Sequence, residues 1–301
     1  MNSLQQYLLA ALSPNTLKAY RDDVQHFMQW GGKLPATAKQ VARYLAHYAT
    51  TLSVSTLTRR VTAIHQTHVH QGLQSPCHQA IVKETLQGIR RIHGCAQRRV
   101  LPLLQAQLDV WARQQQGMRG MRDKALLLVG FAGAFRRSEL VNIHYHDITF
   151  VVQGMVIRLP RCKTDPVGVG RDIAIPYAAK GKPCAVRALQ VWLSSAAIQQ
   201  GKVFRRINRY GQVMLQGISG QTVALVVKRC VRELGLPAAA YAGHSLRAGL
   251  VTSAALAGVE VWKIRKQTGH QSDAMLQRYI RDSQLFEHHP LQQIRKPQPS
   301  A

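Results

Sequence analysis

Acidic residues are scarce in this sequence: Asp and Glu number 14 against 40 Lys and Arg, which gives a formal net charge of +26 at pH 7. The basic residues are spread along the whole chain rather than gathered in one tail. Distributed cations neutralise phosphates and release counterions, whereas membrane binding usually shows one concentrated basic amphipathic helix. The charge therefore predicts a nucleic-acid partner. The alternative is a solvated charged surface, but the excess is larger than solubility needs.

Other missing features argue against whole classes of protein. No apolar run approaches the length of a membrane span, and the N-terminus lacks a basic region followed by a cleavage site. The five cysteines are odd in number and form no C-x-x-C pair, which argues against a disulfide framework or a zinc knuckle. There is no glycine-rich phosphate loop and no metal-ligand cluster. We expect a cytoplasmic, nucleoid-associated protein that uses no metal or cofactor.

The chain has 301 residues, of which 46% are apolar, and this is enough for two folded domains. The first, residues 1–94, is predicted to be a helical DNA-binding bundle. Ser13 and Pro14 are suited to start its first helix. Apolar residues recur at helical spacing over 14–30, 38–52, 55–71 and 79–92. Four basic residues on its polar faces are candidate DNA contacts, with a solvated surface as the equal alternative: Arg59, Arg60, Arg90 and Arg91.

Residues 95–102 interrupt the helical periodicity and end in a proline, so they are the predicted interdomain linker. The second domain, 103–301, is predicted to combine helices with a small antiparallel sheet, which makes the chain mainly α. Its helices are expected at 103–114, 123–131, 183–199 and 221–234. Alternating Val and Ile residues predict strands at 147–152, 155–159 and 172–176. The loop 201–220 carries Arg205 and Arg206, which are further candidate DNA contacts, with a solvated loop as the alternative.

Polar residues that are able to bind and attack a phosphate cluster late in the chain. His244 and Arg247 are three residues apart, so on a helix that begins near Gly243 they would share one face at its positive end. His270 and Tyr279 follow. Upstream, Arg136 comes directly after a buried helix, where it must pair or serve a ligand; Glu139 is the candidate partner, and a purely structural pair is the alternative. Lys163 lies at the tip of the predicted hairpin.

Taken in order, FRRSEL at 135–140, Lys163, GHSLR at 243–247, TGH at 268–270 and Tyr279 resemble the tyrosine recombinase (phage integrase) family, including its Cre-like and Xer-like members. The opening SPNTLKAYRDDVQHFMQW is similar to the family's N-terminal core-binding domain. The resemblance covers nearly the whole chain. It implies a clamp of two domains around DNA, and site-specific breaking and rejoining of strands through a 3′-phosphotyrosine.

The resemblance also assigns roles. Arg136 and Arg247 match the arginines that clasp the scissile phosphate, and Arg137 is an alternative for the first. Tyr279 matches the nucleophile, Lys163 the acid that protonates the leaving 5′-hydroxyl, and His244 the histidine that helps deprotonate the tyrosine. His270 matches the His or Trp that contacts the phosphate, and Glu139 a supporting acid.

Elementary chemistry agrees with these roles. A free tyrosine has a pKa near 10, so only about one in a thousand is ionised at neutral pH and a positive site must favour the phenolate. The resemblance implies that four protomers act on two duplexes bearing a specific core site, and that residues after Tyr279 dock on a neighbouring subunit. Packing of that tail on its own domain is the alternative. Two other functions remain open, a catalytically silent DNA-binding protein and a type IB topoisomerase.

Overall fold

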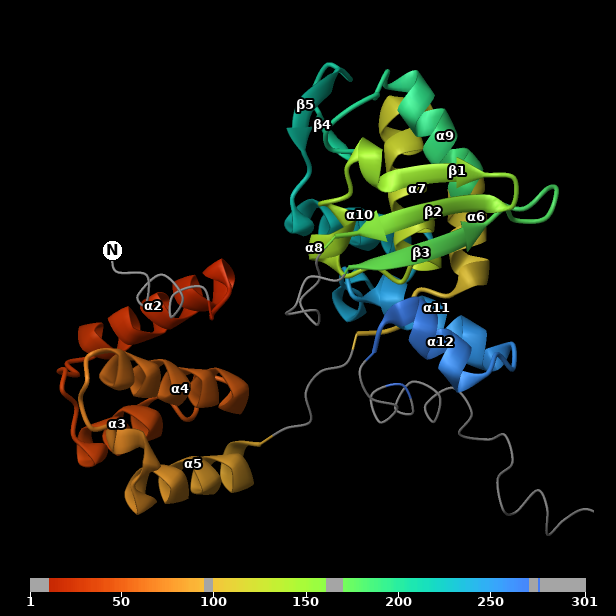
Figure 1. The fold of residues 1–301 in the computed structure, drawn as a ribbon. Helices are drawn as coiled ribbons and strands as arrows, with labels where there is room; N and C mark the ends of the chain where they lie inside the picture. The colour runs from red at the N-terminus through yellow and green to blue at the C-terminus, as the bar shows by residue number, and fades with distance from the viewer. Residues whose placement is uncertain (1–10, 95–99, 161–169, 271–275, 277–301) are drawn as a thin grey trace, which may run out of the picture. The chain divides into compact units, whose positions relative to one another are not determined.

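The computed structural model describes residues 11–94, 100–160, 170–270 and 276, and the chain forms two compact units, 1–98 and 99–301 (Figure 1). Most of the predicted linker, 95–99, lies outside the described residues. Leu101 and Leu103 donate backbone hydrogen bonds to the carbonyls of Ala240 and Ser245, at 2.9 and 3.0 Å. The second unit therefore begins before residue 103, where the sequence placed its start.

The first unit consists of helices, as the periodicity predicts: α2 (Pro14–Gln29), α3 (Ala38–His47), α4 (Val54–His70), the short η1 (Pro76–His78) and α5 (Ala80–His93). The Ser13 hydroxyl caps α2 by accepting the N–H of Thr16, and Thr37 and Ser53 cap the next two helices in the same way. Helix α2 packs on α4, and α3 packs on α5. Large buried side chains fill the space between them: Phe27, Tyr44, Leu45, Leu57, Ile64 and Leu86.

A buried charge cluster holds α2 to α4. Asp23 is 3% exposed and accepts two hydrogen bonds from the Arg59 guanidinium, at 2.7 and 2.9 Å. Arg60 lies 3.5 Å from the same carboxylate and donates to the Tyr44 hydroxyl at 2.8 Å. A carboxylate buried without partners would cost several kcal/mol, so these arginines stabilise the domain by satisfying it.

The second unit combines helices with two antiparallel sheets. Its helices are α6 (Gln105–Gln114), α7 (Gly117–Ala132), α8 (Arg137–Leu140), η2 (Tyr145–Asp147), α9 (Ala185–Ser195), α10 (Gly220–Glu233), η3 (Ala238–Ala240), α11 (Ser245–Leu256) and α12 (Val261–Thr268). In the described part, no helix is both long and apolar enough to cross a bilayer. The predicted mainly α fold with a small antiparallel sheet is confirmed.

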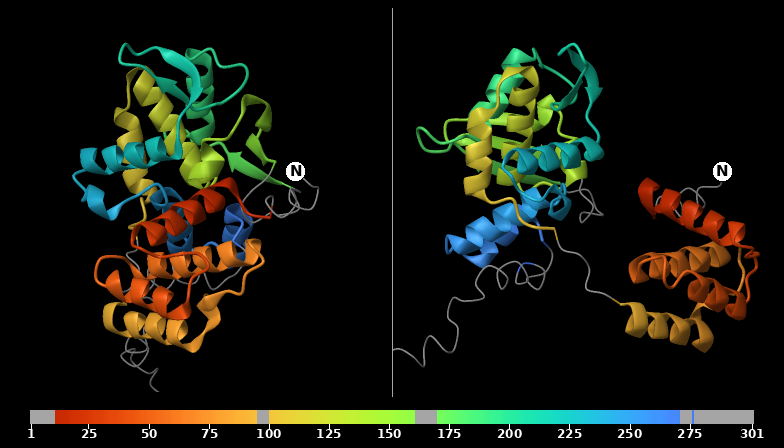
Figure 2. Two further views of the ribbon diagram at one scale, coloured as in Figure 1. Left: turned by 90° about the vertical axis from the view of Figure 1, so that its left-hand side faces the viewer. Right: turned by 180° about the vertical axis from the view of Figure 1, so that it is seen from behind.

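The larger sheet has the strand order β1 (Ile148–Val151), β2 (Gly154–Leu159), β3 (Arg171–Pro176), as predicted. Ile148 pairs with Ile157, and the β2–β3 register runs from Gly154 opposite Pro176 to Leu159 opposite Arg171. Its inward residues join the core of the second unit, whose centre is α7. In Figure 1 the sheet lies in front of α7, and the view from behind in Figure 2 shows the helices on the opposite side.

The segment 201–220 is not the loop that the sequence predicts. It contains a second hairpin, β4 (Arg205–Ile207) and β5 (Val213–Gly217). Three residues are too few to show alternation, and Arg205 and Arg206 mask the strand by their polarity. The turn is closed by the Asn208 side chain, whose oxygen accepts the N–H groups of Tyr210 and Gln212 at 2.9 and 3.0 Å.

Close backbone packing places α11 against the start of the second unit. A Cβ added at Gly249 would lie 1.9 Å from the carbonyl oxygen of Leu103, a distance that no side chain tolerates. Glycine at this position lets α11 approach the chain that precedes α6. The helix that carries Arg247 is therefore held in place by the backbone at Leu103 as well as by its packing in the core.

Candidate active site

The first part of the site is the junction between α7 and α8. Ala134 adopts a left-handed backbone conformation, with φ of 48°, and follows the end of α7. Arg136 lies two residues further on, and its backbone N–H and guanidinium donate to the two oxygens of Glu139 at 2.9 and 2.6 Å. The Glu139 side chain is 5% exposed and that of Arg136 is 24% exposed. The carboxylate thus anchors the guanidinium at the edge of the core and leaves part of it accessible.

The second part is the start of α11. His244 occupies the position before the helix, and Arg247 lies within its first turn. Arg247 is 2% exposed, and its Nη1 donates to the carbonyl of Ala134 at 2.8 Å. This hydrogen bond joins α11 to the α7–α8 junction across 113 residues of sequence. The two candidate phosphate-binding arginines therefore belong to one structural unit.

The third part is the end of α12, where Gly269 adopts a left-handed conformation with φ of 66° and terminates the helix. His270 follows and is 8% exposed. Its Nδ1 lies 2.7 Å from the Oγ1 of Thr268, which is fully buried. The cap at Gly269 thus fixes the backbone before His270, and the Thr268 hydroxyl fixes the imidazole ring.

Arg171, which the sequence reasoning missed, connects these parts. Its Nη1 donates to the backbone carbonyl of Gln267 at 3.2 Å, and its Nη2 lies 3.8 Å from Glu139. A Cβ at Gly269 would lie 2.4 Å from Nη1, so the guanidinium packs on the end of α12. Gln267 in turn donates to the carbonyl of Ala132 at 2.8 Å. No local pattern marks Arg171, because only the β2–β3 pairing brings it here.

Burial, together with the neighbouring positive charges, lowers the pKa of both histidines. Burial, followed by the charges of Arg247 and Arg136, lowers the pKa of His270 to about 4. His244 is exposed in part, yet burial, followed by the charges of Arg247, Arg136 and Arg137, lowers its pKa as well. The two guanidiniums lie close enough to both imidazoles to lower their pKa values, and such a positive neighbourhood favours an anion.

Two predicted catalytic residues lie outside the described residues. Lys163 belongs to the connection between Leu159 at the end of β2 and Arg171 at the start of β3. Tyr279 follows Leu276, which is fully buried against Val251, Ala255 and Ile264 of α11 and α12. In the described part, no group of three or more His, Cys, Asp or Glu residues is arranged to hold a metal ion.

Comparison with known proteins decides the family. The sequence profile of the Phage integrase family matches residues 104–285, and that of the phage integrase N-terminal SAM-like domain matches residues 2–71. The chain belongs to the phage integrase family. It is therefore a tyrosine recombinase, an enzyme class that acts in site-specific DNA recombination.

Named relatives place the chain within the tyrosine recombinases. It is 40% identical over 290 residues to an integrase/recombinase XerD homolog of Selenomonas ruminantium, an alignment that covers 93% of this chain and 85% of the relative. It is 26% identical over 285 residues to the tyrosine recombinase XerC of Pelobacter propionicus, covering 89% and 85%.

Solved structures share the fold of this recombinase at low sequence identity. A lambda integrase dimer bound to a COC′ core site aligns with a TM-score of 0.63 and 16% identity, covering 99% of this chain and 79% of that one. The Tn1549 transposon integrase in complex with transposon right end DNA gives 0.62 and 16%, covering 94% and 92%.

Two of the DNA contacts predicted for this recombinase are buried and paired within the protein. Arg60 is 8% exposed and bonded to Tyr44, and Arg205 is 8% exposed and donates to the carbonyls of Lys202 and Gln200. Both guanidiniums have the internal partners that a buried charge needs. Arg59 is half exposed but is paired with Asp23. Sequence periodicity does not reveal this pairing, since the carboxylate lies on another helix.

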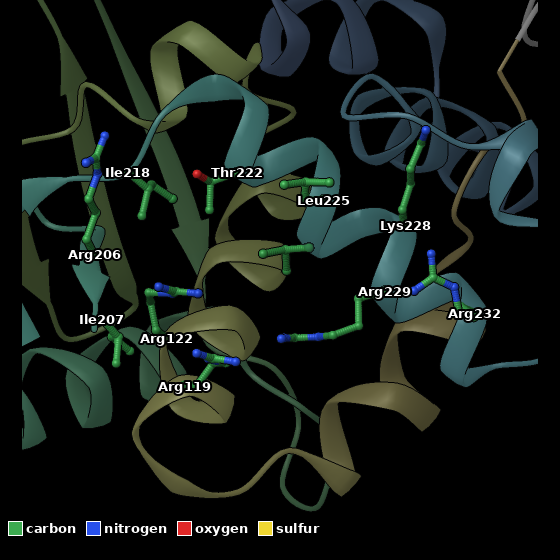
Figure 3. Close-up of a pocket in the computed structure, with 11 residues that line it drawn as sticks. Arg119, Arg122, Arg206, Ile207, Ile218, Thr222, Leu225, Lys228, Arg229 and Arg232 are labelled. Atoms are coloured by element: carbon green, nitrogen blue, oxygen red, sulfur yellow. The ribbon is translucent and has the colours of Figure 1, made fainter. Parts of the chain in front are cut away.

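Other predicted contact residues of the recombinase are exposed. Arg90 and Arg91 lie on the surface of α5. Arg206 lines a groove of about 540 Å³ between α7, α10 and the second hairpin, shown in Figure 3. Asp123 neutralises part of this groove by pairing with Arg122 and Arg229. Three further basic residues line the groove: Arg119, Lys228 and Arg232.

Proposed function

We propose that this recombinase cleaves one DNA strand by attack of Tyr279 on a phosphate held by Arg136, Arg247 and His270. The observation that carries the proposal is the convergence of the two arginines and two histidines, which Glu139 and the Ala134 carbonyl support from behind. Two guanidiniums present planar arrays of N–H donors that suit the non-bridging oxygens of a phosphodiester. They supply the charge that phosphoryl transfer enzymes often obtain from Mg²⁺.

In the proposed step one bond to phosphorus forms as another breaks, and each proton that is released has an acceptor. The Tyr279 oxygen forms a bond to phosphorus as the bond to the 5′ oxygen breaks. The phenolic proton passes to His244, whose lowered pKa leaves it neutral and able to accept at pH 7. Lys163 gives a proton to the leaving 5′ oxygen. The 3′-phosphotyrosine keeps the energy of the phosphodiester, so a new 5′-hydroxyl reverses the step without a nucleotide cofactor.

Covalent trapping tests the reaction. We expect wild-type protein to form a protein–DNA adduct with members of a duplex library that has a randomised centre and a nick that prevents religation. Tyr279→Phe should abolish the adduct, because it removes only the nucleophilic oxygen. Tyr210→Phe is the matched control, since Tyr210 is exposed on the second hairpin and should leave the yield unchanged. An adduct that survives Tyr279→Phe would refute the assignment of the nucleophile.

The same adducts separate the competing functions. Sequencing the trapped duplexes reveals a preferred core site if the protein is a site-specific recombinase. No adduct from any duplex would indicate a silent DNA-binding protein. Relaxation of a supercoiled plasmid without sequence preference would indicate topoisomerase activity. A recombinase that acts on chromosomal or mobile DNA would be found on the nucleoid.

We further propose that four protomers assemble on two duplexes and exchange their C-terminal tails. The turn between α11 and α12 exposes an apolar group, Leu256, Val259, Val261 and Trp262, and the Trp262 side chain is 59% exposed. The sequence after Asp282 contains complementary apolar residues: Leu285, Phe286, Leu291 and Ile294. Apolar groups left exposed on a surface often mark an interface.

Removal of the tail tests this assembly. Truncation after Asp282, or Trp262→Ala, should prevent DNA-dependent tetramers in light-scattering measurements while a single protomer still binds a half-site. Leu215→Ala is the control, because Leu215 is 80% exposed on the second hairpin, outside the α11–α12 turn. Unchanged assembly of the truncated chain would show that the tail packs on its own domain.

A further inference from the structure

Thr268 is a buried hydroxyl in contact with a ring nitrogen of a candidate catalytic residue. Its side chain is fully buried, and its Oγ1 lies 2.7 Å from the Nδ1 of His270, a short hydrogen bond between two nearly inaccessible groups. Either atom is able to be the donor. The direction of this bond decides which ring nitrogen of His270 carries the hydrogen, because a neutral imidazole has one N–H and one bare nitrogen.

The geometry around the hydroxyl favours one direction. Among the described residues, the Thr268 hydroxyl also donates to the carbonyl of Arg265, but at the longer distance of 3.4 Å. That carbonyl already accepts the N–H of Gly269 at 2.8 Å in the cap of α12. The hydroxyl hydrogen therefore has its better acceptor in Nδ1. Burial and the neighbouring Arg247 and Arg136 lower the pKa of His270 to about 4, so the ring is neutral at pH 7 and has one bare nitrogen that is able to accept.

The bond direction matters for binding an anion. With Nδ1 as the acceptor, the remaining nitrogen, Nε2, carries the hydrogen and becomes a donor. A phosphate oxygen accepts hydrogen bonds only, so the opposite tautomer would place a lone pair against it. In the same way, the second ring nitrogen of a metal-binding histidine is set by the partner of the first.

We propose that Thr268 is a positioning residue that donates to Nδ1 of His270 and thereby presents Nε2–H to the scissile phosphate. This inference rests on the proposed phosphate-binding role of His270. It adds to that role a residue that does not itself touch DNA. This role also gives a reason for a buried hydroxyl at the end of α12, a place that packing alone could fill with an aliphatic side chain.

Two measurements test the proposal on the full-length chain. Nitrogen NMR of protein with ¹⁵N-labelled histidine, assigned by comparison with His270→Gln, should show a bare Nδ1 and a protonated Nε2 at pH 7. Single-turnover adduct formation with a trapped duplex should fall about tenfold in Thr268→Val, which keeps the shape but removes the donor. Thr268→Ser should restore most of the rate, and DNA affinity should be unchanged in both variants.

The controls keep a structural effect apart from positioning. Thr252→Val makes the same change at another buried threonine of the same domain and should leave the rate unchanged. A wild-type spectrum with the hydrogen on Nδ1, or on both nitrogens, would overturn the proposal, as would an unaltered rate in Thr268→Val. A wild-type rate in His270→Gln would refute the phosphate-binding role itself. The NMR result needs no activity, so failure of the proposed reaction is distinguishable from failure of this inference.

Discussion

Arg247→Ala should lower the rate of adduct formation about a thousandfold while leaving DNA affinity almost unchanged. Loss of one preorganised donor to a developing anion costs about 10² to 10³ in rate, and this residue carries a full charge in addition. Affinity survives because many other phosphate contacts remain along a chain with net charge +26. The measurement is single-turnover cleavage at saturating duplex, set beside a binding titration.

A residue in the groove provides the control for Arg247. Arg232 lines the groove of Figure 3, where we expect contact with flanking phosphates. Arg232→Ala should weaken binding and reduce the slope of log affinity against log salt by about 1, with the cleavage rate at saturation unchanged. Because Arg247 is buried, its variant also requires a thermal melt. Equal losses of cleavage rate in the two variants would contradict the assignment of Arg247 to the scissile phosphate and of Arg232 to flanking phosphates.

Glu139→Ala should lower both cleavage and stability. It removes the carboxylate that holds the backbone and guanidinium of Arg136 and lies near Arg171. Breaking a buried pair from one side costs about 3 to 5 kcal/mol, and the exposed quarter of Arg136 places the expected loss at the lower end, about 3 kcal/mol. We expect cleavage to fall about a hundredfold, because the guanidinium loses its fixed position.

Glu139→Gln is the matched variant. Its amide oxygen still accepts one hydrogen bond from Arg136, so it should recover part of the stability and part of the rate. Urea unfolding and adduct formation measure the two effects separately. If Glu139→Ala unfolds like the wild type, the carboxylate does not anchor Arg136 in solution.

Local features of the sequence were reliable guides to helices and strands. Ser13 and Pro14 start α2 as predicted, and the alternation over 147–159 and 172–176 forms the sheet. Capping and side-chain periodicity act over a few residues, so the sequence displays them directly. The three-residue strand β4 was missed because its arginines hide any alternation.

The sequence by itself supplied the candidates for catalysis and the order in which they occur: Arg136, Lys163, His244, Arg247, His270 and Tyr279. It also determined the net positive charge, which predicts a polyanionic partner. Only the tertiary structure decided which charges are hidden, as for Arg60 and Arg205, and which unmarked residues enter the site, as for Arg171 and Thr268. The physical reason is distance along the chain. The bond from Arg247 to Ala134 spans 113 residues, and no local pattern encodes a contact that packing alone creates.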